Sequence, residues 1–209
     1  MKHTLSIILL IISVTVFSQN NTVPYSRDYE FTEGIFLTID QFKQNDPIPK
    51  TSIVSSIPKN QLDYLTQVME QKNFTYKDAT GVEQKVNTGA VWGYCQNRTI
   101  FLNFNNSFNR VVVIGSLFHF TSVIRTIIPS ADPMPMRMDN SFDEIRQFIL
   151  DTDVNKVLDF NVKNMETILS RDADLYDQFM KLKKREKADL IFVYLRKYNE
   201  KHPLYLSIK

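Results

Sequence analysis

The sequence predicts an α+β fold in which an antiparallel β meander, or a partly open β-barrel, is followed by C-terminal helices. Short apolar runs separated by tight polar turns fill residues 73–123, and such turns are too short for the crossover that parallel strands need. Apolar residues at helical spacing dominate only after residue 161. The length of 209 residues and the 43% hydrophobic content suit one domain with a packed core.

The first 18 residues have the features of a cleavable secretory signal. Lys2 supplies a positive start, an apolar run covers residues 5–17, and Val16 and Ser18 stand where signal peptidase needs small or compact side chains. The run is shorter than the ~20 residues that cross a bilayer, which disfavours an uncleaved anchor. We expect residues 1–18 to be removed, the product to be periplasmic or secreted, and the mature chain to carry no transmembrane segment.

The mature chain is expected to consist of a flexible polar leader, residues 19–28, and a single α+β domain, residues 29–209. The domain is β-rich over residues 29–160 and helical over residues 161–202. Residues 61–72 fit a short helix or a distorted strand equally, because their apolar spacing is compatible with both.

Alternation and turn residues locate the individual elements. The expected strands are residues 73–77, 82–86, 90–95, 99–104, 108–114, 115–123, 145–150 and 156–160. The last two are interpreted as a hairpin, and the alternative is a helix begun by Ser141 with Glu144 in the capping-box position. Helices are expected over residues 161–172 and, as one long element, over residues 172–198.

Composition excludes several classes of function. A net charge of +2 lacks the cationic excess of a dedicated nucleic-acid binder. Cys95 is the single cysteine, so no intrachain disulfide forms, and its apolar neighbours indicate a small buried hydrophobe. No phosphate-binding loop, serine-hydrolase motif or zinc-ligand spacing is present. We therefore name no catalytic residue and expect no cofactor.

One segment resembles a metal loop. Asp151, Asp153 and Asn155 alternate as the oxygen ligands at the start of a calcium loop do. The sixth position is Lys156 where the loop requires glycine, and the twelfth is Val162 where a glutamate should complete the coordination. We therefore favour a polar hairpin turn whose side chains bond their own backbone.

A basic cluster and an aromatic set are the remaining candidates. The possible partner surface consists of Lys181, Lys183, Lys184, Arg185 and Lys187. These cations point in nearly every direction around a helix, which favours a solvated segment over a partner-binding face.

The possible ligand-lining residues are Trp92, Tyr94, Phe118 and Phe120. A packed core is the favoured interpretation, because aromatic residues prefer strands and bury large areas. His119 is interpreted as a strand histidine with a hydrogen-bond partner.

Several segments are similar to those of a known group. They are residues 33–38 with Phe42, residues 91–94, residues 114–120 and the tail at residues 194–205. In these segments the chain resembles a family of uncharacterised secreted proteins of Bacteroidota-type bacteria. The resemblance implies an exported protein with a shared fold, and it brings no established activity.

These observations favour an exported soluble envelope protein that acts by non-enzymatic binding or as an accessory factor. Its partner would be an envelope protein or a small ligand. The alternative is a β-barrel-like protein that binds an apolar or glycan ligand in its interior. A roomy interior lined by Trp92 and the strand phenylalanines would support the alternative, and a filled interior would argue against it.

Overall fold

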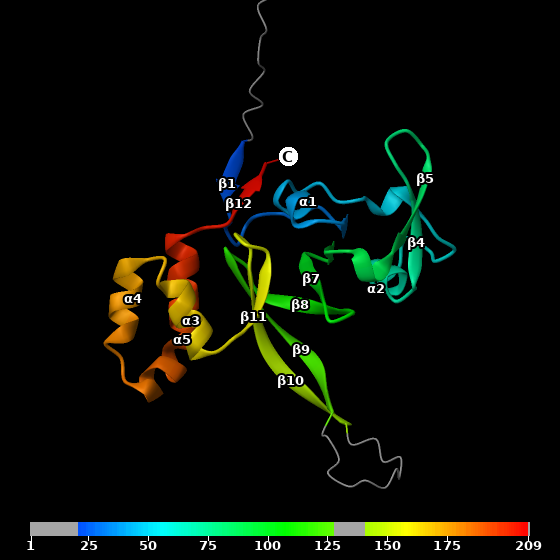
Figure 1. The fold of residues 1–209 in the computed structure, drawn as a ribbon. Helices are drawn as coiled ribbons and strands as arrows, with labels where there is room; N and C mark the ends of the chain where they lie inside the picture. The colour runs from blue at the N-terminus through cyan, green and yellow to red at the C-terminus, as the bar shows by residue number, and fades with distance from the viewer. Residues whose placement is uncertain (1–20, 128–140, 209) are drawn as a thin grey trace, which may run out of the picture.

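The computed structural model describes residues 21–127 and 141–208, so the predicted signal at residues 1–18 lies outside the described residues. The α+β prediction is confirmed, because a curled antiparallel sheet in the form of a half-barrel precedes C-terminal helices. Helices stand on one side of this sheet, and a smaller sheet with a short helix stands on the other (Figure 1).

The main sheet has seven strands, and every neighbouring pair is antiparallel. Their order is β11 (Lys156–Asp159), β10 (Ser141–Asp151), β9 (Leu117–Ile127), β8 (Ser107–Val113), β7 (Thr99–Phe104), β6 (Gly93–Gln96) and β2 (Gly34–Phe36). The turns β6–β7 and β7–β8 use Asn97-Arg98 and Asn105-Asn106, all four with φ between 50° and 59°. Positive φ at both central residues is a tight hairpin geometry that asparagine tolerates better than most residues other than glycine. The antiparallel pairing of consecutive strands confirms the predicted meander.

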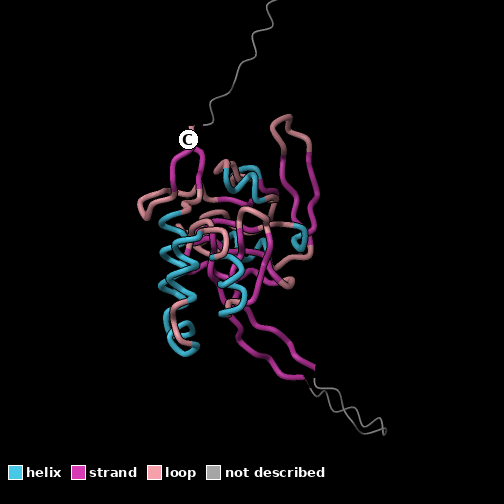
Figure 2. The backbone as a smooth tube through the Cα atoms, turned by 60° about the vertical axis from the view of Figure 1, so that its left-hand side comes forward, coloured by secondary structure: helices cyan, strands magenta, loops and turns pink. Residues whose placement is uncertain are grey.

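Strands β9 and β10 pair over their whole length, from Leu117 opposite Asp151 to Ile127 opposite Ser141. Their outer part leaves the body of the protein as a two-stranded ribbon (Figures 1 and 2). The inner part of β10 forms the predicted hairpin with β11. The alternative of a helix from Phe142, capped by Ser141, is wrong, because both residues belong to β10.

The concave face of the main sheet is closed by elements from both ends of the chain. Phe42 of α1 (Ile39–Lys43) packs there, together with Leu204 and Leu206 near the C-terminus. Leu206 belongs to β12 (Tyr205–Ser207), which pairs with β1 (Thr22–Pro24). The prediction of a flexible leader is therefore wrong for residues 22–24, which a partner strand far away in sequence holds in place.

A second core lies under the smaller sheet. This sheet has the order β3 (Ile53–Val54), β4 (Asn73–Lys77) and β5 (Glu83–Asn87), with short 3₁₀ turns at Lys50–Ser52 and Thr88–Ala90. The predicted hairpin of β4 and β5 is confirmed. The open question about residues 61–72 is settled by α2 (Tyr64–Met69), a helix because Tyr64, Leu65, Val68 and Met69 fill this core together.

Three helices cover the convex face of β9 and β10: α3 (Val162–Leu169), α4 (Ala173–Met180) and α5 (Lys184–Lys201). The prediction of one long helix over residues 172–198 is wrong, because the chain turns between α4 and α5. The turn brings the rings of Phe179 and Tyr194 to 4.7 Å in an edge-to-face contact. Asp172 accepts the Leu175 N–H at the start of α4, and Glu186 accepts the Lys183 N–H at the start of α5.

His119 lies on the side of β9 that faces these helices. Its ring meets the rings of Phe160 and Phe192 edge-on, at centroid distances of 5.0 and 4.7 Å, and the two phenylalanine rings also contact each other. Nε2 shares a hydrogen bond of 3.0 Å with Oε1 of Gln147, whereas Nδ1 is buried and has no hydrogen-bond partner among the described residues. The interpretation as a strand histidine with a hydrogen-bond partner is confirmed. Burial lowers the pKa of His119, because the charged imidazolium is poorly solvated there.

This lowered pKa predicts a loss of stability in mild acid. The unfolded state takes up a proton at about pH 6.5, where the folded state resists it, so the His119 contribution is complete above that pH and is lost below it. Between pH 7.5 and 5.5 the free energy of unfolding of the wild type should fall more than that of His119→Gln, by at most about 1.4 kcal/mol per pH unit. Urea titrations at the two pH values measure the difference, and equal falls would contradict the prediction.

Candidate functional site

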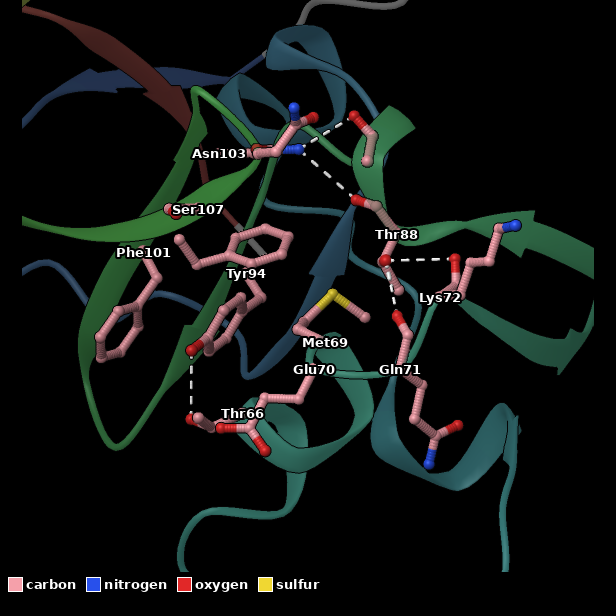
Figure 3. A pocket seen from close by; sticks show the side chains of 13 residues that line it. Thr66, Met69, Glu70, Gln71, Lys72, Thr88, Tyr94, Phe101, Asn103 and Ser107 are labelled. Carbon is pink, nitrogen blue, oxygen red and sulfur yellow. Dashed lines mark hydrogen bonds between the residues drawn. The ribbon is translucent and has the colours of Figure 1, made fainter. Parts of the chain in front are cut away.

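A groove of about 610 Å³ lies between α2 and the face of β6–β8 that points away from the concave core (Figure 3). A larger hollow of about 770 Å³ lies between the N-terminal segment and α5, but Tyr25 is its single aromatic lining residue. The first groove instead combines an aromatic wall with a polar rim, the combination that is typical of small-ligand sites.

The aromatic wall is built by cross-strand pairing. Tyr94 and Phe101 are directly opposite in the β6–β7 register, and their rings stack at 4.7 Å with an interplanar angle of 10°. Phe108 of β8 meets Tyr94 edge-on at 5.2 Å. Alternation directs Cys95 and Leu102 to the concave core and leaves Tyr94 and Phe101 on the groove side.

A glutamine on the sheet fixes α2 beside this wall. Oε1 of Gln96 accepts the backbone N–H groups of Leu65 and Thr66 at 2.7 and 3.2 Å, and so caps the start of the helix from outside. Nε2 of Gln96 donates to the Thr66 hydroxyl, which also bonds the Tyr94 hydroxyl at 3.1 Å (Figure 3). Burial, with a smaller effect of the Glu70 charge, raises the pKa of Tyr94, so its hydroxyl remains neutral at physiological pH.

The other end of the groove is held by side-chain bonds to loop carbonyls. The Thr88 hydroxyl donates to the carbonyl of Gln71 at 2.6 Å. The Asn103 amide donates to the carbonyls of Gly89 and Val91 at 3.0 and 2.8 Å. Because hydrogen bonds hold both ends, the groove is formed before any ligand arrives.

The rim of the groove carries polar side chains that have no bonding partner. The side chains of Glu70, Lys72, Asn106 and Ser107 are exposed, and they form no hydrogen bond or ion pair within residues 21–127 and 141–208. Glu70 and Lys72 are the charged residues in the lining, so their formal charges cancel. The arrangement offers hydrogen-bond donors and acceptors around an apolar wall.

The possible ligand-lining residues do not form one site. Phe118 and Phe120 are fully buried in the concave core. Trp92 is partly buried against the same core, 4.7 Å from the ring of Phe42 and 6.3 Å from that of Phe118. Of these four predicted residues, Tyr94 is the one that lines the groove. The prediction that these four residues line one ligand site is therefore corrected: α1 and the terminal strands fill the concave face, so Trp92, Phe118 and Phe120 are core residues.

The basic cluster consists of four exposed side chains and one buried side chain. Lys181, Lys183, Lys184 and Arg185 are exposed around the turn between α4 and α5. Lys187 is only 8% exposed, and its ammonium group contacts a Glu166 carboxylate oxygen at 2.6 Å and lies over the ring of Phe179. Lys187 is therefore removed from the possible partner surface, because it joins α5 to α3 and α4.

The segment with alternating oxygens forms a hairpin turn. Asp151 is fully buried, and its Oδ2 lies 2.6 Å from an Arg171 nitrogen. Its Oδ1 accepts the Asp153 N–H, and Asn155 adopts a φ of 48° in the turn. The guanidinium group of Arg171 thus occupies the place beside Asp151, the first candidate ligand, where a calcium ion would have to bind. Among the described residues, no group of three or more His, Cys, Asp or Glu side chains is placed to hold a metal ion.

Cys95 is fully buried, as its apolar surroundings predict. Burial raises the pKa of its thiol to about 12, so the reactive thiolate is not formed at physiological pH.

The sequence alone did not single out most of the groove. Phe101 and Phe108 are visible as strand aromatics, but Glu70 and Lys72 follow a helix whose position depends on Gln96. The alternation in residues 99–104 is the one local signal that places Phe101 and Asn103 on a common face.

Comparisons with models of protein families, with curated proteins and with solved structures find no match for this chain. Within residues 21–127 and 141–208, no helix has the length and apolar character needed to span a membrane.

Proposed function

We propose that the protein is an exported, non-enzymatic binding protein whose ligand site is the groove between α2 and β6–β8. The observation that carries the proposal is an aromatic wall bordered by polar side chains that have no bonding partner in the described part of the chain. Hydrogen bonds already hold the frame of this groove. The signal-like residues 1–18 support export. The filled concave face argues against the alternative of a ligand inside the half-barrel.

Blocking the groove is the direct test. In Ser107→Trp an indole is placed at the rim, where the serine hydroxyl has no partner among the described residues, so we expect little loss of stability. The matched control is Thr121→Trp, at an exposed position of β9 outside the groove. The probes are short oligosaccharides, tripeptides and fatty acids, and the readout is the NMR chemical shifts of the Tyr94 and Gly89 amides.

At least one probe class should shift these amides in the wild type and in Thr121→Trp, and should fail to shift them in Ser107→Trp. Circular dichroism spectra of all three proteins check that each is folded. Shifts that persist in Ser107→Trp, or the absence of shifts with every probe class, would overturn the proposed function.

A further inference from the structure

We infer that the groove binds the sugar rings of an uncharged glycan. This inference rests on the proposed function, and it adds the chemical class of the ligand. It follows from three properties of the groove: its aromatic wall, its unpartnered polar rim and its balanced charge.

The aromatic wall supplies an apolar surface of the right kind. Phe101 and Phe108 are both partly exposed and both line the groove, so their rings are accessible to a ligand. A sugar ring presents C–H groups on one face, and such a face packs well on an aromatic ring. The volume of about 610 Å³ lies within the range of small-ligand sites, roughly 300–1,000 Å³.

The polar rim argues for a polyol and against a lipid. Glu70 accepts hydrogen bonds, Lys72 donates them, and the Asn106 amide does both. Adjacent sugar hydroxyls satisfy all these groups at once. A fatty acyl chain has no hydroxyl groups with which to bond them.

The charge balance argues for a neutral sugar. The formal charges of Glu70 and Lys72 cancel, so the groove offers no net attraction to an acidic glycan. A peptide is disfavoured for a different reason. Strand β6 lies between β2 and β7, and β7 lies between β6 and β8, so neither has a free edge to which a peptide strand can add.

The experiment compares four probes on the same protein. They are cellobiose and chitobiose as neutral sugars, digalacturonic acid as an acidic sugar, and trialanine as a peptide. The readout is the dissociation constant from titration of the Tyr94 and Gly89 amide shifts. Glu70→Gln keeps the shape of the rim but removes the charged acceptor, and Glu83→Gln, on the exposed part of β5, is the matched control.

A neutral sugar should bind most tightly. Its dissociation constant should rise about tenfold in Glu70→Gln, the loss expected for one charge-assisted hydrogen bond, and should not change in Glu83→Gln. Tighter binding of trialanine or digalacturonic acid at the groove would overturn the glycan inference and leave the proposed function standing. Binding of a neutral sugar without any effect of Glu70→Gln would also overturn it. If none of these four probes and none of the fatty acids used to test the proposed function binds at the groove, both the glycan inference and the proposed function are rejected.

Discussion

Replacing Phe42 by alanine should lower the free energy of unfolding by about 3–5 kcal/mol, the cost of a cavity left by a buried phenylalanine. Phe42 is fully buried. Its ring lies 5.4 Å from that of Phe36, 4.7 Å from Trp92 and 5.5 Å from Phe118. The surrounding rings belong to β2, β9 and the segment directly before β6, and they cannot collapse easily into the space. We therefore expect this substitution to be more destabilising than Arg171→Met.

Phe142→Ala is the matched control, since it removes the same atoms from a side chain that is 48% exposed on β10. It should change the stability by no more than about 0.5 kcal/mol. Urea denaturation followed by far-UV circular dichroism measures both variants without relying on Trp92, which touches Phe42. If the two variants lost the same stability, the concave face would not be a packed core, and an interior ligand site would have to be reconsidered.

Arg171→Met should be the second most destabilising change, at about 3 kcal/mol. The substitution leaves the Asp151 carboxylate fully buried and without its countercharge. We expect the lower end of the range for broken buried pairs because the Arg171 side chain is itself 39% exposed. In the double variant Asp151→Leu/Arg171→Met the charge is also removed, and part of the lost stability should return.

Arg146→Met provides the comparison for a surface pair. Arg146 and Asp159 lie 3.0 Å apart, but their side chains are 42% and 44% exposed. Such a pair contributes about 0–1 kcal/mol, so the free energy of unfolding should hardly change. Both variants should be denatured with urea, because guanidinium chloride is a salt and would itself weaken the exposed ion pair by screening. Equal losses in Arg171→Met and Arg146→Met would show that burial of Asp151 has no energetic consequence.

The meander could be predicted because its signals are local. Alternating side chains indicate strands, and pairs such as Asn105-Asn106 reach the positive φ values that tight hairpins need. The pairing of β1 with β12 joins residues 22–24 to residues 205–207. No local pattern specifies such a distant partner, and the leader therefore looked flexible. The break between α4 and α5 was missed for a similar reason, since it is the contact of Phe179 with Tyr194 that requires the chain to fold back.

In the candidate site, two aromatic residues show most clearly what local alternation determines and what only tertiary packing determines. Tyr94 and Phe118 are both bulky strand residues, and alternation alone determined that each points to one face of the sheet. Which element covers that face was decided only by the tertiary structure: α2 stands beside Tyr94 and leaves a groove, whereas α1 packs its Phe42 directly on Phe118. Periodicity is a property of neighbouring residues, but the covering of a face depends on segments that are distant in sequence and meet only when the chain is folded.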